Sequence, residues 1–236
     1  MWIIASLILA YLVGSIPFSL VIGRRVKGID LREHGSGNLG ATNVYRTLGP
    51  GWGGMCLLLD VAKGVAAVLA MTAVVHAWPD GESMPLRLTG DMYRILAGLV
   101  AVLGHSFSPF AGFRGGKGIA TSFGVFLVLE PFPVLFAFAV FLAVFFATRI
   151  VSLGSLSAAA VFPWAVLLFE YRSPKPFSKT LIVFSFLMAA LVVWRHRANI
   201  QRLRDGTEKT LAAPLTANGD QPMPTDTPDE SKGDRP

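Results

Sequence analysis

Long apolar runs separated by short polar loops dominate the first 195 residues of the chain. An apolar run of about 17–25 residues can cross a bilayer as a helix. The fourth run is short for a full span, and only Glu130, Pro131 and Pro133 separate it from the fifth. The pattern predicts an all-α, polytopic membrane protein, a bundle of about seven transmembrane helices at residues 2–23, 52–76, 91–109, 117–130, 132–148, 153–170 and 178–195.

Lysine and arginine set the expected orientation of this bundle. They collect in the first, third and fifth loops and after the last run, whereas the even-numbered loops contain fewer. Because positive charge favours the cytoplasmic side, these odd loops and the C-terminus are expected in the cytoplasm and the N-terminus outside. The first run lacks the basic start of a signal peptide and is interpreted as a retained span.

Composition supports the membrane interpretation. The chain is 53% hydrophobic and 15% charged, whereas about a quarter of the residues in a soluble domain are charged. The net charge of +6 is therefore attributed to loop bias and not to nucleic-acid binding. The predicted membrane domain covers residues 1–211, and the polar tail at 212–236 is expected to be a disordered cytoplasmic segment because it has too little apolar surface to fold.

The third loop carries the first clue to function. Residues 104–121 read GHSFSPFAGFRGGKGIAT, with His105 near the start and Lys117 among Gly115, Gly116 and Gly118. Backbone N–H groups of such a turn can form a nest for an anion, and a lysine adds a point charge suited to phosphate. The alternative is a tight cytoplasmic turn with positive-inside charges.

The first loop offers a second set of polar groups. Residues 33–50 read EHGSGNLGATNVYRTLGP and contain Ser36, Asn38, Thr42, Asn43 and Arg46. The arginine can hold a phosphate through two parallel hydrogen bonds. A flexible connecting loop is the alternative, but loops of this length are often functional.

Two further clusters lie at the same expected side of the membrane. Asp60 and Lys63 are one helical turn apart inside an apolar run, where ionisable groups are costly and usually functional. His196 and Asn199 share one face of the segment after the last run. All four clusters together predict a basic pocket at the inner membrane surface, without the clustered carboxylates and histidines of a metal site.

These motifs together resemble the bacterial acyl-phosphate:glycerol-3-phosphate acyltransferases, which are small integral membrane enzymes. The resemblance covers roughly residues 1–210 and is carried by GSIPFSLVIGR at 14–24, SGNLGATNVYR at 36–46, DVAKG at 60–64, GHSFSPFAGFRGGKGIAT at 104–121 and HRANIQRLRDGTE at 196–208. The other large class of glycerophosphate acyltransferases uses a histidine followed five positions later by aspartate, and none of the four histidines here has that aspartate.

The resemblance implies the reaction and its participants. A fatty acyl group passes from acyl phosphate to the sn-1 hydroxyl of glycerol 3-phosphate, giving lysophosphatidic acid and phosphate without a cofactor. The expected partners are these two substrates, membrane lipid and the soluble enzyme that supplies acyl phosphate; no nucleic acid is expected. The expected location is the bacterial inner membrane, with the active site facing the cytoplasm.

The resemblance also assigns roles to residues. The expected catalytic residues, which should contact glycerol 3-phosphate or the phosphate of the donor, are Ser36, Arg46, Lys117, His196 and Asn199. In the expected binding set around them, the glycines present backbone N–H groups to acyl phosphate and His105 braces the turn. This set comprises Asn38, Thr42, Asn43, Lys63, His105, Gly115, Gly116, Gly118 and Thr121.

The general base stays open at this stage. His196 could accept the hydroxyl proton because histidine has a pKa near neutrality, and a substrate phosphate could do so because its second pKa is near 6.

Two rival functions fit part of the pattern. A transporter would explain the spans and basic clusters but predicts polar groups along a path through the membrane, whereas here they gather at one face. A lipid-phosphate transferase with another head group would share the pocket but usually needs Mg²⁺ and its carboxylates.

Overall fold

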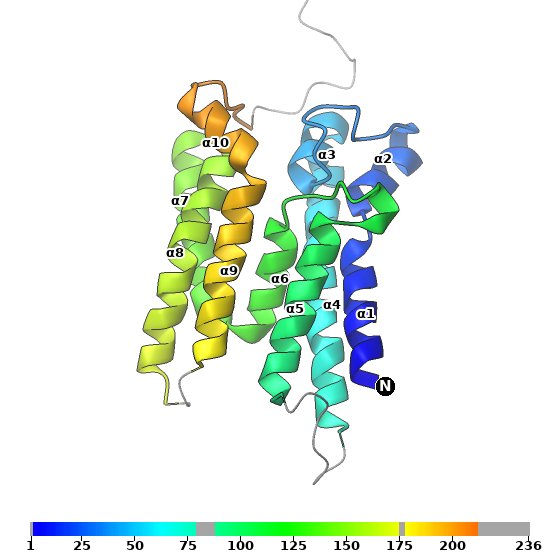
Figure 1. The fold of residues 1–236 in the computed structure, drawn as a ribbon. Helices are drawn as coiled ribbons and strands as arrows, with labels where there is room; N and C mark the ends of the chain where they lie inside the picture. The colour runs from blue at the N-terminus through cyan, green and yellow to red at the C-terminus, as the bar shows by residue number, and fades with distance from the viewer. Residues whose placement is uncertain (1, 79–87, 175–177, 212–236) are drawn as a thin grey trace, which may run out of the picture.

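The protein is a bundle of helices along one direction (Figure 1). A computed structural model describes residues 2–78, 88–174 and 178–211, and within these ranges every regular element is helical. The predicted tail at 212–236 lies outside the described residues. The elements are α1 (Trp2–Ser15), α2 (Phe18–Lys27), α3 (Ala41–Leu48), α4 (Pro50–His76), α5 (Gly90–Ser106), the short 3₁₀ helix η2 (Pro109–Ala111), α6 (Ile119–Leu129), α7 (Pro131–Thr148), α8 (Val151–Arg172), α9 (Lys179–Arg195) and α10 (Arg197–Arg204).

Each of the seven predicted apolar runs contains a helix, but they do not all cross a membrane in the same way. Helix α4, the segment Gly90–Ala111, α7 and α8 are each long and apolar enough to span. Two bent pairs, α1 with α2 and α9 with α10, raise this to six if each pair is one span. Helix α6 has only 11 residues, which is about 16 Å, and is too short to cross a hydrocarbon core of about 30 Å.

The first predicted run is broken at Pro17. The chain bends by 41° between α1 and α2, because proline has no N–H to donate to the preceding helix. The carbonyl of Pro17 instead accepts from the N–H groups of Leu20 and Val21 and starts α2. Helix α2 ends at Gly28, which has a φ of 66°, a conformation that glycine adopts without strain.

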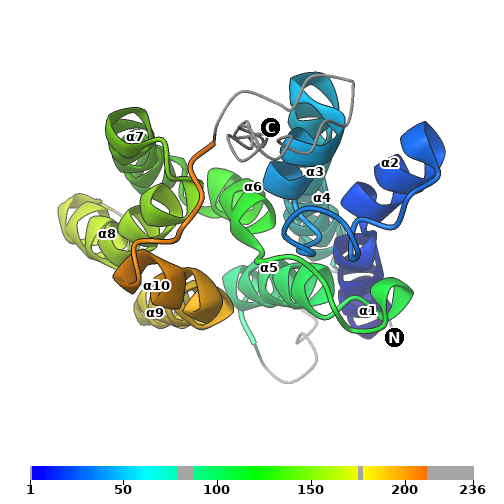
Figure 2. The same ribbon diagram turned by 90° about the horizontal axis from the view of Figure 1, so that it is seen from above.

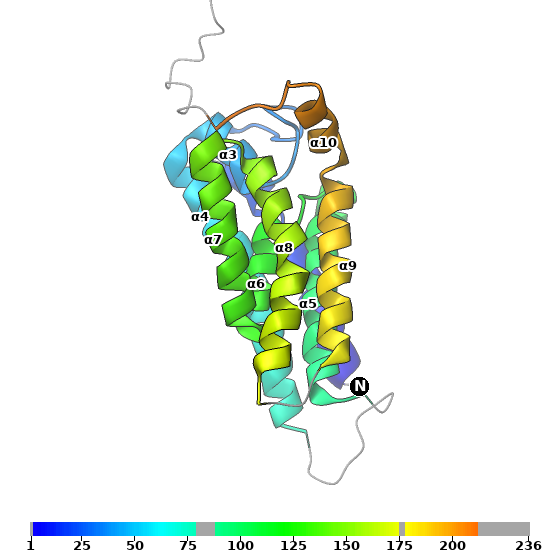
Figure 3. The ribbon, with the colours of Figure 1, turned by 90° about the vertical axis from the view of Figure 1, so that its left-hand side faces the viewer.

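The helices form two groups with α6 between them. Helices α1, α4 and α5 pack against one another, α7 and α9 each pack against α8, and α6 contacts both α4 and α7. The view along the bundle shows α6 near the centre (Figure 2). Helices α3 and α10 and the loop before α6 all lie at one end, which is the upper end in Figures 1 and 3 and is called the α3/α10 end below.

Small residues allow α4 and α6 to approach closely. A Cβ atom built on Gly124 would lie 2.1 Å from the carbonyl oxygen of Val61, and one on Gly64 would lie 2.3 Å from that of Thr121. Such contacts bring backbones together in membrane bundles, where packing replaces the hydrophobic effect as the driving force.

Gly124→Ala tests this contact. The added methyl group must push α6 away from α4, so we expect a loss of about 1–3 kcal/mol in stability, measured as a lower midpoint of thermal unfolding in detergent. Gly54→Ala on the same α4 is the matched control, because nothing lies within 4 Å of its added Cβ. Equal midpoints for the two variants would contradict the close packing.

Candidate functional site

A polar cavity of about 470 Å³ opens at the α3/α10 end of the bundle. It lies between the first loop with α3, the start of α6, the upper end of α8, and α10. The sequence clusters predicted to converge therefore do so. The predicted site residues that line it are Ser36, Asn38, Thr42, Asn43, Arg46, His105, Lys117, Gly118, His196 and Asn199.

The first turn of α6 forms one wall of the cavity. Gly118 precedes the helix with a φ of 81°, and Ile119 and Ala120 line the cavity beside it. The first four N–H groups of a helix have no intrahelical partner, and the helix dipole makes this end favourable for an anion. The start of α6 is therefore an anion-binding position.

The side chain of Lys117 reaches from the turn before α6 to α10. Its ammonium donates a hydrogen bond to the side-chain oxygen of Asn199. Burial, together with the nearby Arg202, Arg195 and Arg46, lowers the pKa of Lys117 to about 8, although the carboxylate of Glu208 opposes this shift. The lysine is thus charged at neutral pH and loses that charge in mildly alkaline solution.

Glu208 supplies a negative charge to this basic cavity. Its carboxylate accepts hydrogen bonds from Ser152 Oγ at 2.6 Å, Asn199 Nδ2 at 2.5 Å and Arg202 Nε at 2.7 Å. Burial opposes ionisation of this group, but the three hydrogen bonds outweigh it and lower the pKa of Glu208. Three donors placed around one carboxylate show that this part of the cavity is shaped for an anionic oxygen.

His196 sits at the junction of α9 and α10 and is 2% exposed. Its Nδ1 lies 2.8 Å from the carbonyl oxygen of Val192, so Nδ1 carries the proton and Nε2 is left as an acceptor. Burial first, and then the charge of Lys117, lowers the pKa of His196 to about 4. The imidazole is therefore neutral at pH 7.

The first loop is held in shape by Asn43. Its side-chain oxygen accepts from the N–H of Ser36 at 2.8 Å, and its amide donates to the carbonyls of Leu31 and His34. Asn43 thus shapes the wall on which Ser36 lies. From the adjacent α3, Arg46 donates to the carbonyl of Lys209 at 3.1 Å, which ties the segment after α10 across the cavity.

The N–H groups of Gly115 and Gly116, predicted to hold acyl phosphate, already have backbone partners. Their N–H groups donate to the carbonyls of Ser106 and His105, each at 3.2 Å, and neither residue lines the cavity. A Cβ on Gly116 would lie 2.2 Å from His105 Nε2, so glycine is required here for close packing. The free N–H groups belong to the start of α6 instead.

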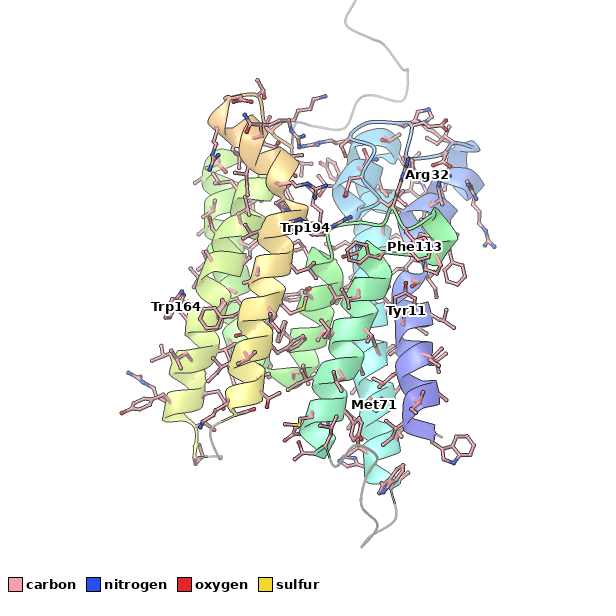
Figure 4. The ribbon with its side chains drawn as sticks, in the orientation of Figure 1. Tyr11, Arg32, Met71, Phe113, Trp164 and Trp194 are labelled. Atoms are coloured by element: carbon pink, nitrogen blue, oxygen red, sulfur yellow. The ribbon has the colours of Figure 1, made fainter. Side chains whose placement is uncertain are left out.

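Arg195 fixes the position of this glycine turn. Its guanidinium donates to the carbonyls of Gly115 and Gly116, each at 2.8 Å. The aromatic rings of Phe107 and Trp194 flank the guanidinium, with centroids 5.5 and 5.8 Å away. Figure 4 shows Trp194 near the α3/α10 end, the end that also carries the loop residue Phe113. The turn that presents Lys117 is thus attached to the last long helix.

Besides Gly115 and Gly116, two further predicted binding residues do not line the cavity. Lys63 donates to the carbonyl of Ile16 at 2.9 Å and pairs with Asp60 at 2.7 Å, with its side chain 2% exposed. Thr121 is fully buried on α6 below the cavity wall. Asp60 and His105 do line the cavity, and His105 Nδ1 lies 3.5 Å from the Asp60 carboxylate. The Asp60–Lys63 pair therefore supports the site from below.

An apolar groove of about 330 Å³ continues from the polar cavity. It lies between α4, α6, α7, α8 and α9 and is lined almost entirely by hydrophobic side chains. Five residues line both spaces: Leu57, Ile119, Ala120, Phe141 and Ser155. The anion-binding start of α6 therefore stands where the polar cavity meets the groove.

The structure adds residues that were not assigned to the site from the sequence: Ser152, Ser155, Arg195, Arg202 and Glu208. Arg195, Arg202 and Glu208 lie in or next to the HRANIQRLRDGTE motif, which was a usable signal. Ser152 and Ser155 lie in an apolar run without any motif, and only the packing of α8 brings them to the cavity.

Arg195→Lys tests the attachment of the glycine turn. One guanidinium nitrogen, Nη2, reaches both carbonyls while the planar group lies beside Phe107 and Trp194. Lysine keeps the charge but lacks this planar group that stacks on aromatic rings, so we expect the turn to open more often. Hydrogen exchange at the amides of Gly115 and Gly116 should then be faster by about tenfold, the effect of about 1.4 kcal/mol. Arg204→Lys, at an exposed position on α10, should leave that exchange unchanged. No difference between the variants would contradict the role of Arg195.

Known proteins resemble this chain over nearly the whole described length. Residues 4–206 match the family model described as glycerol-3-phosphate acyltransferase. A glycerol-3-phosphate acyltransferase of Chlorobaculum parvum is 39% identical over 224 residues, covering 88% of this chain and 96% of the relative. Glycerol-3-phosphate acyltransferase 2 of Moorella thermoacetica is 44% identical over 211 residues, covering 89% and 98%.

A solved structure shows the same fold. The crystal structure of PlsY (YgiH), an integral membrane glycerol 3-phosphate acyltransferase, in its glycerol 3-phosphate form aligns with a TM-score of 0.74 and 36% identity, covering 89% of this chain and 96% of that one. Its lysophosphatidic acid form aligns with a TM-score of 0.72 and 35% identity. The chain described here is therefore an integral membrane protein that belongs to the glycerol-3-phosphate acyltransferase family.

Proposed function

We propose that the protein transfers a fatty acyl group from acyl phosphate to the sn-1 hydroxyl of glycerol 3-phosphate, releasing lysophosphatidic acid and inorganic phosphate. This proposal rests on one observation: the cationic cavity continues into an apolar groove at the start of α6. One anionic head group with one hydrocarbon chain fits across that junction. Family membership favours an acyltransferase over the transporter and lipid-phosphate transferase that the sequence left open.

The phosphate of the donor belongs at the start of α6 in this proposal. Its acyl chain then enters the groove beside Ile119 and Ala120, which line both spaces. Lys117 and the free N–H groups of the first turn would stabilise the charge that grows on the phosphate as it leaves. Acyl phosphate is a mixed anhydride with a good leaving group, so positioning and charge stabilisation suffice for the reaction.

An acyl-phosphate donor also suits the lining of the cavity. Coenzyme A would bring an adenine, which proteins often stack on an aromatic side chain. Among the described side chains that line the cavity, Phe141 is the aromatic one, and it lies at the junction with the groove. Within the described part of the chain, the cavity thus offers charge for phosphates, and its one phenyl ring lies at the groove.

Glycerol 3-phosphate is placed on the side of Ser36, Arg46 and His196. Arg46 can hold the phosphate through two hydrogen bonds, and Ser36 and Asn38 offer polar groups for the glycerol. A crystal structure of the relative PlsY in its glycerol 3-phosphate form is known. The acceptor hydroxyl attacks the acyl carbonyl carbon, a C–O bond forms, and the bond to the phosphate oxygen breaks.

The hydroxyl proton is proposed to pass to a substrate phosphate. With a pKa of about 4 in the empty site, His196 holds a proton more weakly than a phosphate whose second pKa is near 6. The neutral ring can still accept a hydrogen bond at Nε2 and orient the hydroxyl. His196 then positions the acceptor, and the leaving phosphate takes the proton.

The proposed setting is the bacterial inner membrane, with the cavity on the cytoplasmic side. The basic loops that line the cavity lie together at the α3/α10 end, as the positive-inside rule requires. A soluble acyl-phosphate-producing enzyme would then supply the donor from the cytoplasm.

Purified protein in lipid with labelled glycerol 3-phosphate tests the reaction. One sample receives palmitoyl phosphate, another palmitoyl-CoA, and both contain chelator. We expect lysophosphatidic acid from the acyl phosphate alone. Product from the thioester alone would show that the proposed donor is wrong, and no product from either would contradict the proposed reaction.

The pKa of Lys117 predicts how binding depends on pH. A pKa of about 8 means that the charged fraction of Lys117 falls from about 0.9 at pH 7 to about 0.1 at pH 9, while glycerol 3-phosphate stays dianionic. Its Kd, measured by titration calorimetry, should therefore rise by about tenfold over this range. Lys117→Arg should remove that rise because arginine stays charged. An unchanged Kd in the native protein would contradict a binding role for the lysine charge.

A further inference from the structure

Buried aromatic residues line the deep end of the apolar groove, which is called its floor below. Phe126 on α6 and Phe162 on α8 pack edge to face there, with ring centroids 4.4 Å apart. Phe126 is 2% exposed and Phe162 is 7% exposed. Phe184 packs on Phe126 from below at 5.1 Å, and all three belong to one buried hydrophobic cluster. A chain that enters the groove cannot pass this floor without displacing aromatic side chains.

The depth of the groove can be measured along three of its helices, α6, α7 and α8. Ile119, Phe141 and Ser155 mark its mouth, since each lines both the groove and the polar cavity. The floor residues on the same helices, Phe126, Val134 and Phe162, are each seven positions away from these mouth residues. Seven residues of α-helix correspond to about 10 Å, so the groove descends about 10 Å from mouth to floor.

This depth is short compared with a fatty acyl chain. Carbon–carbon bonds of about 1.5 Å in a zigzag advance about 1.25 Å per methylene, so about eight methylenes fill the groove. An extended palmitoyl chain is roughly twice as long. The remaining methylenes need another path.

The groove provides that path on one side. Leu57, which also lines the polar cavity, is 48% exposed. The neighbouring wall residues Leu58 on α4 and Phe138 on α7 are 69% and 39% exposed. Helices α4 and α7 both pack against α6, and the groove opens between them over α6. In a membrane these exposed apolar side chains face lipid, so the outer part of a long chain can leave there without meeting water.

We propose that the Phe126–Phe162 floor limits specific contact to about the first eight methylenes of the acyl chain, and that the rest leaves between α4 and α7 into the lipid. This inference rests on the proposed function, because the occupant is the acyl chain of the donor. Each buried methylene strengthens binding by about fourfold, so the protein selects against short chains and treats all chains beyond the floor alike.

A matched pair of substitutions on α8 tests the path. Ala158 lines the groove three residues below Ser155, whereas Ala160 does not line it and is exposed on the same helix. Ala158→Phe should block the groove about 4.5 Å below its mouth. For each acyl phosphate from C4 to C16, kcat/KM is measured in the variant and in the native protein, and the ratio of the two values is compared. Partitioning of the donor into detergent affects both values equally and cancels in this ratio.

The expected ratios have distinct shapes. For Ala158→Phe the ratio should stay near one at C4, fall by at least tenfold by C10, and remain at that level up to C16. For Ala160→Phe it should stay near one throughout. Identical ratios for the two variants would overturn the inference while leaving the proposed function intact, whereas no transfer by the native protein would overturn both.

A second variant tests the floor itself and covers the case in which Ala158→Phe fails to fold. Phe162→Leu shortens the side chain that closes the groove. Its ratio should be unchanged for chains that end above the floor and higher for chains from about C10 upward. A ratio that does not change at any chain length would show that the floor does not limit the contact.

Discussion

The shortness of α6 is the constraint on which the site depends. A full span at this position would fill the centre of the bundle, but α6 has 11 residues and begins below the level of α3 and α10 (Figures 1 and 3). Irregular backbone at such a depth is tolerated only where it is buried in protein or lines a cavity. Here it does both: the glycine turn is buried under Arg195, and the start of α6 faces the cavity.

Part of the positive charge in the cavity is neutralised before any substrate arrives. Lys117, Asn199 and Glu208 form one hydrogen-bonded chain, and Arg202 joins it from α10. An unpaired cluster of buried cations would be costly in a low dielectric, and Glu208 offsets part of that cost. The same carboxylate restrains the segment after α10, which Arg46 also holds through a backbone carbonyl. An incoming dianion therefore meets a cavity that is already ordered.

The sequence was sufficient to locate the helices and to predict that the polar clusters converge, because apolar runs mark the helices and the clusters lie at alternate loops. It did not show that the run at 117–130 contains only the short helix α6. It could not assign hydrogen-bond donors. Gly115 and Gly116 looked like a phosphate nest, yet their N–H groups are bonded to Ser106 and His105. Which N–H is free depends on the path of the neighbouring chain. Ser152 and Lys63 show the same limit, since helix rotation decides that one reaches the cavity and the other does not.

The side opening of the apolar groove has a consequence for the hydrocarbon chain of a lipid, which need not pass through water while it is bound. Moving a sixteen-carbon chain from hydrocarbon into water would cost about 12 kcal/mol at about 0.8 kcal/mol per methylene. With Leu57, Leu58 and Phe138 bordering an opening toward lipid, the outer end of such a chain can stay in the bilayer throughout a turnover. In the proposed reaction, product release is then lateral diffusion within the membrane, and only glycerol 3-phosphate and inorganic phosphate need to move between the cavity and water.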